Sequence, residues 1–203
     1  MVPMEIADAT GIDIAPAVRL LVKSFALDPQ IAYLFGEECI EREQIVGEFF
    51  SILLAVRVKL ATPALLLKTG AGIGGVAMGY DTRRPSWPPA FTTRWNAMAA
   101  LKPANADRLA QYDGICSKFE PRSAHYYLGV VGVDPSLQGQ GAGTRLIEAF
   151  TQRSSEDPAS TGVFLDTANP INVAYYRRRG FNILGTEALD DQTTLSCLFR
   201  PTP

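Results

Sequence analysis

Residues 125–148 have the sequence His-Tyr-Tyr-Leu-Gly-Val-Val-Gly-Val-Asp-Pro-Ser-Leu-Gln-Gly-Gln-Gly-Ala-Gly-Thr-Arg-Leu-Ile-Glu. The apolar, β-branched run from Tyr126 to Val133 predicts a strand, which Asp134-Pro135 ends because proline cannot donate to a strand ladder. A glycine-rich loop follows at residues 138–143, and apolar residues at helical spacing come after it. A loop of this kind before a helix N-terminus gathers unpaired backbone N–H groups, an arrangement that suits a phosphate anion.

The composition predicts one globular domain, residues 1–203, with 47% hydrophobic and 20% charged residues. A net charge of -2 argues against a nucleic-acid partner, which would need a strongly basic surface. Cys39, Cys116 and Cys197 are widely spaced and His125 is the single histidine, so we expect no metal site and reduced thiols in a cytoplasmic protein. Neither a secretory leader nor a membrane-spanning stretch is evident, and we expect no membrane partner.

Hydrophobic periodicity along the chain predicts a mixed α/β fold. Strands are expected at residues 4–10, 64–69, 76–80, 126–133, 162–167, 181–184 and 193–199. Helices are expected from Asp13, as N-cap, to about residue 28, and at 38–59, 91–101, 104–118, 143–154 and 170–179, with only a turn at 31–35. This order of elements favours a mixed central sheet flanked by helices on both faces.

Two glycine-rich segments compete as phosphate sites. Gly70, Gly72 and Gly75 form a literal G-x-G-x-x-G, but a dinucleotide site needs that loop to open a helix. The segment is followed by Val76 to Tyr80, which predicts a strand, so residues 70–75 are interpreted as a hairpin turn. The loop at 138–143 lacks the lysine and the glycine spacing of the common nucleotide fingerprints. It is either a phosphate site of another kind or a turn without a ligand.

Two linked motifs place the sequence near a known family. The first follows the pattern [QR]-x-x-G-x-[GA] and the second N-x-x-x-x-x-x-Y-x-x-x-G-F; they are formed by Gln138, Gly141, Gly143, Asn169, Tyr176, Gly180 and Phe181. With these motifs the sequence resembles the GNAT superfamily of acetyl-CoA-dependent N-acetyltransferases. Within that superfamily, residues 125–143 and 169–181 look most like the puromycin N-acetyltransferase-type members.

The resemblance implies a binding site for acetyl-CoA. Backbone N–H groups of the loop would hold the CoA pyrophosphate, at Gln138, Gly139, Gln140, Gly141, Ala142, Gly143 and Thr144. The Thr144 hydroxyl would add a contact or cap the helix. In the family the central strand separates from its neighbour, and here Val131 and Val133 would meet pantetheine and the acetyl group, unless they are plain core. Glycines within this strand are compatible with a bulge. Asn169 would bond the cofactor arm, form the turn before Pro170, or do both.

The resemblance also implies catalytic residues. Tyr176 matches the general acid that protonates the departing thiolate, the alternative being a core aromatic; Tyr175 points about 100° away on a helix and is the weaker candidate. For the base, His125 is suitable by its titration range, with a structural role as the alternative. Glu120 is a second candidate. No carboxylate lies within the central strand, where many relatives keep a glutamate.

The expected function is acetyl transfer to the primary amine of a small molecule by direct attack. An acetyl-CoA-binding sensor or partner module without turnover is the alternative, and homodimerisation is left open. Several aromatic residues favour an apolar or aromatic acceptor, although they could be core: Phe35, Phe49, Trp87, Trp95 and Tyr112. The run Arg177 to Arg179 either helps to bind a CoA phosphate or forms a solvated basic face.

Overall fold

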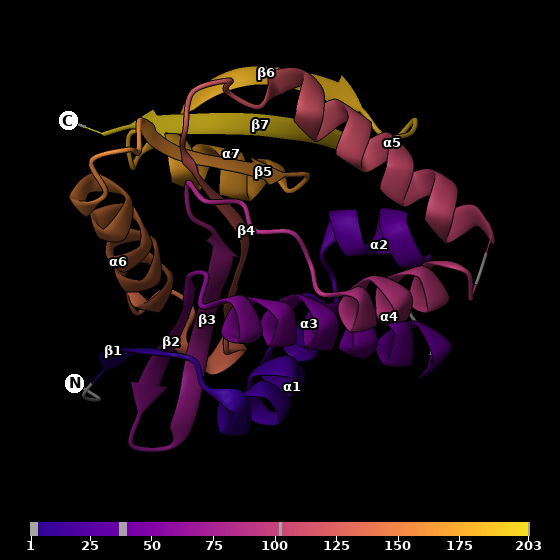
Figure 1. Cartoon of the computed structure of the whole chain (residues 1–203), viewed down its shortest axis with the longest axis horizontal. Helices are drawn as coiled ribbons and strands as arrows, with labels where there is room; N and C mark the ends of the chain where they lie inside the picture. Colours follow the sequence, from indigo (N-terminus) through magenta and orange to yellow (C-terminus); the bar gives the residue numbers. More distant parts are fainter. Residues whose placement is uncertain (1–3, 37–39, 102, 203) are drawn as a thin grey trace.

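One mixed sheet runs through the computed structural model, which describes residues 4–36, 40–101 and 103–202 (Figure 1). Its strand order is β1-β2-β3-β4-β5-β7-β6, so β7 lies between β5 and β6. All neighbouring strands are antiparallel except β4 and β5, which are parallel. The strands are β1 (Glu5–Asp8), β2 (Ala64–Thr69), β3 (Gly72–Tyr80), β4 (Tyr126–Val133), β5 (Gly162–Thr167), β6 (Asn182–Ala188) and β7 (Thr194–Pro201).

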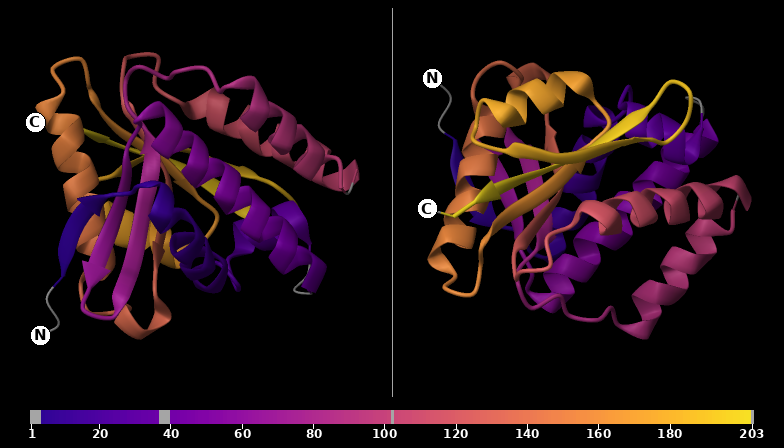
Figure 2. Two further views of the ribbon diagram at one scale, coloured as in Figure 1. Left: turned by 60° about the horizontal axis from the view of Figure 1, so that its bottom comes forward. Right: turned by 90° about the horizontal axis from the view of Figure 1, so that it is seen from above.

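Helices cover both faces of this sheet, as predicted (Figure 2). They are α1 (Ile14–Ser24), α2 (Pro29–Phe35), α3 (Ile40–Leu60), α4 (Pro89–Ala99), α5 (Pro103–Phe119), α6 (Ala142–Glu156) and α7 (Pro170–Arg177). Two short 3-10 turns, Gly11–Asp13 and Pro135–Leu137, complete the description. Of the helices in the described ranges, none is both long and apolar enough to cross a membrane.

The leucine run of β2 shows how the two cores arise. Side chains alternate between the faces of a strand. Leu65 and Leu67 therefore pack in the core under α6, whereas Ala64 and Leu66 pack in the core shared with α1 and α3. The three leucines are 0% exposed, so both faces of the strand are buried over these residues.

The sheet opens between β4 and β5. These strands pair only at Tyr126–Val163 and Tyr127–Phe164, and no further pairs continue this ladder. On the other side of β4 the register with β3 shifts at Gly129, which confirms the bulge expected in this strand. A Cβ on Gly132 would lie 2.6 Å from a Leu21 methyl, so glycine there lets α1 approach the strand closely. The fork frees one edge of β4 in the middle of the sheet.

Residues 29–35 form helix α2, so the prediction of a turn at 31–35 was wrong. The Asp28 carboxylate accepts hydrogen bonds from the backbone N–H groups of Gln30 and Ile31 at 3.0 and 3.1 Å. Pro29 occupies the first helical position, where its missing N–H costs nothing. The helix before it ends at Ser24 rather than near residue 28, because Asp28 caps the next helix.

The glycines at 70–75 belong to a hairpin, as predicted, but the turn is shorter. Strand β3 begins at Gly72, which pairs with Thr69 of β2. A Cβ on Gly75 would lie 2.8 Å from a Leu146 methyl, so this glycine serves close packing against α6. Cys39 lies outside the described residues.

Candidate active site

The loop before α6 has the backbone conformation of an anion cradle. Gly139 and Gly141 have φ values of +76° and +84°, a region that residues with a Cβ rarely adopt. Gly141 is the N-cap of α6, and in the described part of the chain no side chain caps that helix. The first N–H groups of α6 at Ala142, Gly143 and Thr144 are therefore available to an anion, with the helix dipole behind them.

This loop borders a cleft of about 870 Å³, here called the loop cleft. The rest of its wall comes from residues 23–28 of α1 and the following turn, from the end of β4, and from α7 with the residues at its two ends. Of the ten residues predicted to bind the cofactor, nine line the cleft: Val131, Val133, Gln138, Gly139, Gly141, Ala142, Gly143, Thr144 and Asn169. Gln140 does not, because its side chain donates to the Ser136 carbonyl at 2.8 Å and its backbone N–H to that of Leu137.

Thr144 joins α6 to the end of α7. Its Oγ1 lies 3.0 Å from the Tyr175 hydroxyl and accepts a hydrogen bond from Arg179 Nη2 at 2.6 Å. The Arg179 guanidinium also stacks on the Tyr175 ring, 3.4 Å from its centre. Arg179 lines the loop cleft, whereas Arg177 and Arg178 are exposed. One arginine of the basic run thus stands beside the loop, and the hydroxyl of Thr144 orients it instead of capping α6.

Asn169 has the turn-forming role that the sequence suggested. It is the N-cap of α7, and its Oδ1 accepts the backbone N–H of Ile171 at 3.0 Å. The residue also lines the loop cleft.

A second cavity of about 440 Å³, here called the aromatic cavity, lies between β4, β5 and the helices α2 to α5. Its wall includes the aromatic residues Phe49, Tyr80, Trp87, Trp95, Tyr112 and Tyr127. Four of the five aromatics suggested for an acceptor pocket therefore line or border it. The fifth, Phe35, is 1% exposed and packs against Phe49 in the core, so its assignment to the pocket was wrong.

Tyr176 lines both the loop cleft and the aromatic cavity. Its side chain is buried, and its hydroxyl has no hydrogen-bond partner among the described residues. Burial, with a smaller contribution from the charge of Asp166, raises the pKa of Tyr176 well above its ordinary value. The phenol therefore holds its proton at the junction of the two spaces. Tyr175 turns to Thr144 and lines only the loop cleft.

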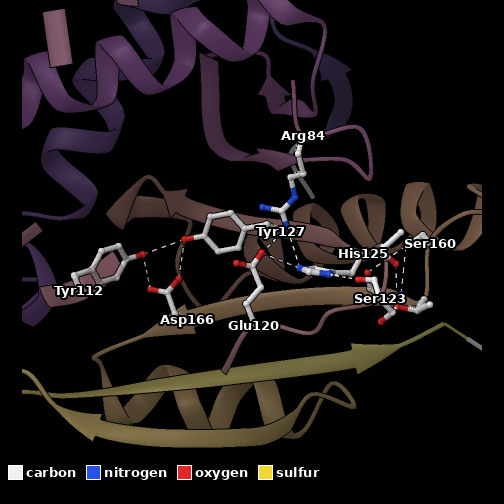
Figure 3. A network of polar contacts seen from close by, with 11 residues as sticks. Arg84, Tyr112, Glu120, Ser123, His125, Tyr127, Ser160 and Asp166 are labelled. Carbon is white, nitrogen blue, oxygen red and sulfur yellow. Dashed lines mark hydrogen bonds and ion pairs between the residues drawn. The ribbon is translucent and has the colours of Figure 1, made fainter. Parts of the chain in front are cut away.

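Asp166 places a carboxylate in the aromatic cavity, near the end of β5 (Figure 3). Tyr127 donates to its Oδ1 at 2.7 Å and Tyr112 to its Oδ2 at 2.9 Å. Burial raises the pKa of Asp166 to about 6, although the two phenols favour its charged form. Asp166 was not predicted as a site residue; the signal in the sequence is an acidic side chain inside the apolar strand at 162–167.

His125 belongs to a neighbouring network outside the aromatic cavity (Figure 3). Its ring is 6% exposed, with Nδ1 donating to the Ser123 carbonyl at 2.7 Å and Nε2 lying 3.0 Å from a Glu120 carboxylate oxygen. Arg84 bonds the same Glu120 oxygen at 2.8 Å and lies over the Tyr127 ring. His125 and Glu120 thus form a structural cluster beside the site, and neither lines either space.

In residues 4–36, 40–101 and 103–202, no group of three or more His, Cys, Asp or Glu side chains could hold a metal ion. Cys116 and Cys197 are free thiols.

Comparison with solved structures finds the same fold in several acetyltransferases. One is described as "histone acetyltransferase HPA2 and related acetyltransferase" from Corynebacterium glutamicum. It matches with a TM-score of 0.73 at 21% sequence identity, and the match covers 100% of this chain and 98% of that one. The Drosophila melanogaster polyamine N-acetyltransferase matches with a TM-score of 0.65 at 16% sequence identity, and the match covers 98% of this chain and 100% of that one. A mosquito arylalkylamine N-acetyltransferase-like 5b protein matches with a TM-score of 0.60 at 14% sequence identity, and the match covers 98% of this chain and 100% of that one.

A family model described as "Acetyltransferase (GNAT) family" matches residues 80–181, half of the chain. The matched segment starts at the last residue of β3 and includes the fork of the sheet, the loop at 138–143 and Tyr176. Motifs, fold and family model agree, and the chain belongs to the GNAT family of acetyltransferases.

Proposed function

We propose that the protein transfers an acetyl group from acetyl-CoA to the primary amine of a small aromatic or apolar molecule. The observation that carries this proposal is the place of Tyr176, a buried phenol that borders both the loop cleft and the aromatic cavity. One side chain thereby touches the space for the donor and the space for the acceptor.

The loop cleft fits acetyl-CoA, which supplies an acetyl group activated as a thioester. The positive φ values of Gly139 and Gly141 and the uncapped start of α6 suit the pyrophosphate. Arg179 adds a cation at the same end. The freed edge of β4 at Val131 and Val133 suits the amide groups of pantetheine. Gln140 stabilises the turn and does not contact the cofactor in this scheme.

Tyr176 acts as the proton donor in this scheme. Like an ordinary phenol it carries its proton at neutral pH, and burial raises its pKa further. The hydroxyl, which bonds none of the described residues, also has a hydrogen bond to gain, and the sulfur of the departing thiolate would supply the acceptor.

Asp166 is a better proton acceptor than His125 on geometric grounds. Its carboxylate lines the aromatic cavity, and a pKa of about 6 leaves it ionised yet appreciably basic at neutral pH. His125 has both ring nitrogens engaged outside that cavity. We therefore assign removal of the amine proton to Asp166, directly or through water.

The nature of the acceptor follows from the wall of the aromatic cavity. The centre of the Trp95 ring lies 5.6 Å from that of Phe49 and 5.5 Å from that of Trp87. Such a wall suits a flat apolar group. The Drosophila and mosquito structural neighbours are a polyamine and an arylalkylamine N-acetyltransferase-like protein, which supports a small amine as the class. The likeness to puromycin N-acetyltransferase-type members makes puromycin one acceptor to try.

Release of CoA in the presence of a panel of amines tests the proposal. The panel contains phenethylamine, tyramine, puromycin and spermidine, and a reaction without amine corrects for hydrolysis and for the protein thiols. Aromatic amines should give the largest kcat/KM. Binding of acetyl-CoA without turnover of any amine would favour the sensor module, and absence of acetyl-CoA binding would overturn both functions.

A further inference from the structure

Arg57 is a buried cation on the wall of the aromatic cavity. It belongs to α3, and its side chain is 2% exposed. It lines the cavity together with Tyr80, Tyr127 and Asp166. The guanidinium carbon lies 4.5 Å from the centre of the Tyr80 ring, so the ring covers one face of the group. The edge of the guanidinium, which carries its N–H donors, still needs partners.

Most of these donors have no partner in the described part of the chain. Nη1 donates to the carbonyl of Leu53, one turn back in the same helix, at 2.8 Å. Nε is buried without any partner among the described residues. Arg57 also takes part in none of the ion pairs that these residues form. A guanidinium buried without an anion carries a large desolvation cost, which a structural role through one carbonyl does not offset.

The nearby charged groups are committed elsewhere. Burial, and secondarily the positive charge of Arg84, lowers the pKa of Arg57, although an arginine stays charged in proteins. Arg84 itself pairs with Glu120. On its far side Arg57 borders a separate cavity whose wall includes four acidic residues: Asp8, Asp81, Glu156 and Asp157. Asp8 pairs with Arg153, and Asp81 accepts from Arg83 Nε at 2.8 Å. Glu156 accepts from Gln152, and Asp157 accepts from Thr82. Asp166 forms no ion pair with Arg57 among the described residues. Each of its oxygens accepts a phenol hydrogen bond and has a further lone pair for the amine.

We infer that the acceptor carries a carboxylate as well as its primary amine and aromatic group, as an aromatic amino acid does, and that Arg57 binds this carboxylate. The inference rests on the proposed function, whose acceptor it specifies. The planar fork of a guanidinium matches the two oxygens of a carboxylate. Asp166 would face the amine, Arg57 the carboxylate, and the rings of Trp87 and Trp95 the aromatic group. All four side chains line the same cavity.

The same charges discriminate against simpler amines. A cavity of about 440 Å³ is in the range of small-molecule sites, so an aromatic amino acid fits by size. An amine without a carboxylate would displace water from the aromatic cavity and offer no acceptor to the Arg57 donors that face it. A site built to hydrogen-bond a polar group rejects the analogue that lacks it for this reason.

Matched pairs of acceptors test the inference. Steady-state kinetics compare L-phenylalanine with phenethylamine, L-tyrosine with tyramine and L-tryptophan with tryptamine. The amino acid of each pair should have a kcat/KM about 10- to 100-fold higher, the range for a hydrogen bond to a charged group. L-phenylalaninamide, which keeps the shape but loses the charge, should behave like the amine. In Arg57→Met the ratio within each pair should collapse toward unity, and Arg57→Lys should restore part of it.

Arg153→Met is the matched control, because Arg153 pairs with Asp8 away from the aromatic cavity. This variant should keep the preference of the unmodified protein, and circular dichroism checks the fold of all variants. Equal kcat/KM values within each pair, or an unchanged ratio in folded Arg57→Met, would overturn the inference while the proposed function stands. Turnover of aliphatic amines alone would overturn the inference together with the aromatic acceptor of the proposed function, and acetyl transfer itself would stand. A protein that binds no acetyl-CoA would instead overturn the proposed function.

Discussion

Tyr127 and Asp166 are joined by a 2.7 Å hydrogen bond at the point where β4 and β5 separate. Tyr127 forms the last pair of this parallel ladder, with Phe164, and Asp166 lies two residues farther along β5. The hydrogen bond thus spans the start of the fork, and Tyr112 of α5 adds a second bond to the same carboxylate. Two donors favour the charged carboxylate and burial opposes it, which leaves its pKa at about 6.

Asp166→Asn should lower kcat/KM for aromatic amines by about 10²- to 10⁴-fold, the usual contribution of a general base. The amide keeps the size of the side chain but accepts protons very poorly. CoA release at saturating acetyl-CoA measures the effect. Glu120→Gln is the control, because Glu120 lies in the neighbouring cluster with His125 and should change kcat/KM by less than about threefold. The reverse order of effects would return the base role to the Glu120–His125 cluster.

The pH dependence of acetylation should show the ionisation of Asp166. Its pKa of about 6 means that the carboxyl becomes protonated as the pH falls through 6, and a protonated carboxyl cannot accept the amine proton. Activity should therefore fall on the acid side between about pH 7 and about pH 5. The amine ionises identically for both enzymes, so the ratio of kcat/KM for the unmodified protein to that for Asp166→Asn isolates this group. A ratio independent of pH would contradict the assignment.

Asp166 should also make the folded protein less stable at neutral pH. Its pKa is about 6 in the folded state against an ordinary value of 3.8, so between these values the folded chain binds more protons than the unfolded chain. The free energy of unfolding therefore decreases as the pH rises from 3.8 to 6, and the penalty is complete above 6.

Asp166→Asn removes this penalty, and we expect it to be about 1 to 3 kcal/mol more stable than the unmodified protein at neutral pH. The advantage should shrink near pH ~4, where both side chains are neutral in the folded state. Urea unfolding at the two pH values measures the difference, in which other titrating groups cancel. A variant that is less stable at both would show that the phenol hydrogen bonds outweigh the cost of burial.

The residues that line the loop cleft could be predicted from the sequence far better than those that line the aromatic cavity. The loop at 138–143 could be predicted because its strand, glycines and helix are contiguous, and local patterns specify each of them. The environment of Asp166 could not be predicted in this way, because it comes from distant parts of the chain. Its partners Tyr127 of β4 and Tyr112 of α5 lie 39 and 54 residues away in the sequence.

Helix α2 was missed for a different reason. Asp28-Pro29 is compatible with the end of one helix and with the start of another, and only the bonds from Gln30 and Ile31 to the Asp28 carboxylate decide between them. Arg57 was not predicted as a site residue, because a single arginine on a helix normally reaches solvent. Its burial depends on how α3 packs against the sheet, which the pattern of one helix does not encode.

Tyr176→Phe should lower kcat by about 10- to 100-fold with little change in the KM for acetyl-CoA, because the hydroxyl would act in the proton transfer and the ring would still fill its place. Tyr175→Phe is the matched control on the next residue. Its hydroxyl bonds Thr144 beside the loop, so its loss should raise the KM for acetyl-CoA and spare kcat. Steady-state kinetics on both variants separate the two roles. An unchanged kcat in Tyr176→Phe would remove it as the acid.

Gly141→Ala should weaken the binding of acetyl-CoA without any steric clash. A Cβ at this position has no atom within 4 Å, so the whole effect comes from the φ of +84°, which costs a residue with a Cβ about 1 to 2 kcal/mol. The loop would relax toward another conformation and turn its N–H groups away from the pyrophosphate. Isothermal titration calorimetry should give a Kd for acetyl-CoA raised by about tenfold.

Gly114→Ala provides the matched comparison for this last substitution. Gly114 is exposed on α5, also has no atom within 4 Å of an added Cβ, and its φ lies outside the positive region. Alanine there should stabilise the helix by up to about 1 kcal/mol and leave the Kd for acetyl-CoA unchanged. If both alanine variants bind acetyl-CoA as tightly as the unmodified protein, the positive φ of Gly141 is not needed for the cradle. The anion would then be held by side chains such as Arg179, and Arg179→Met should weaken binding instead.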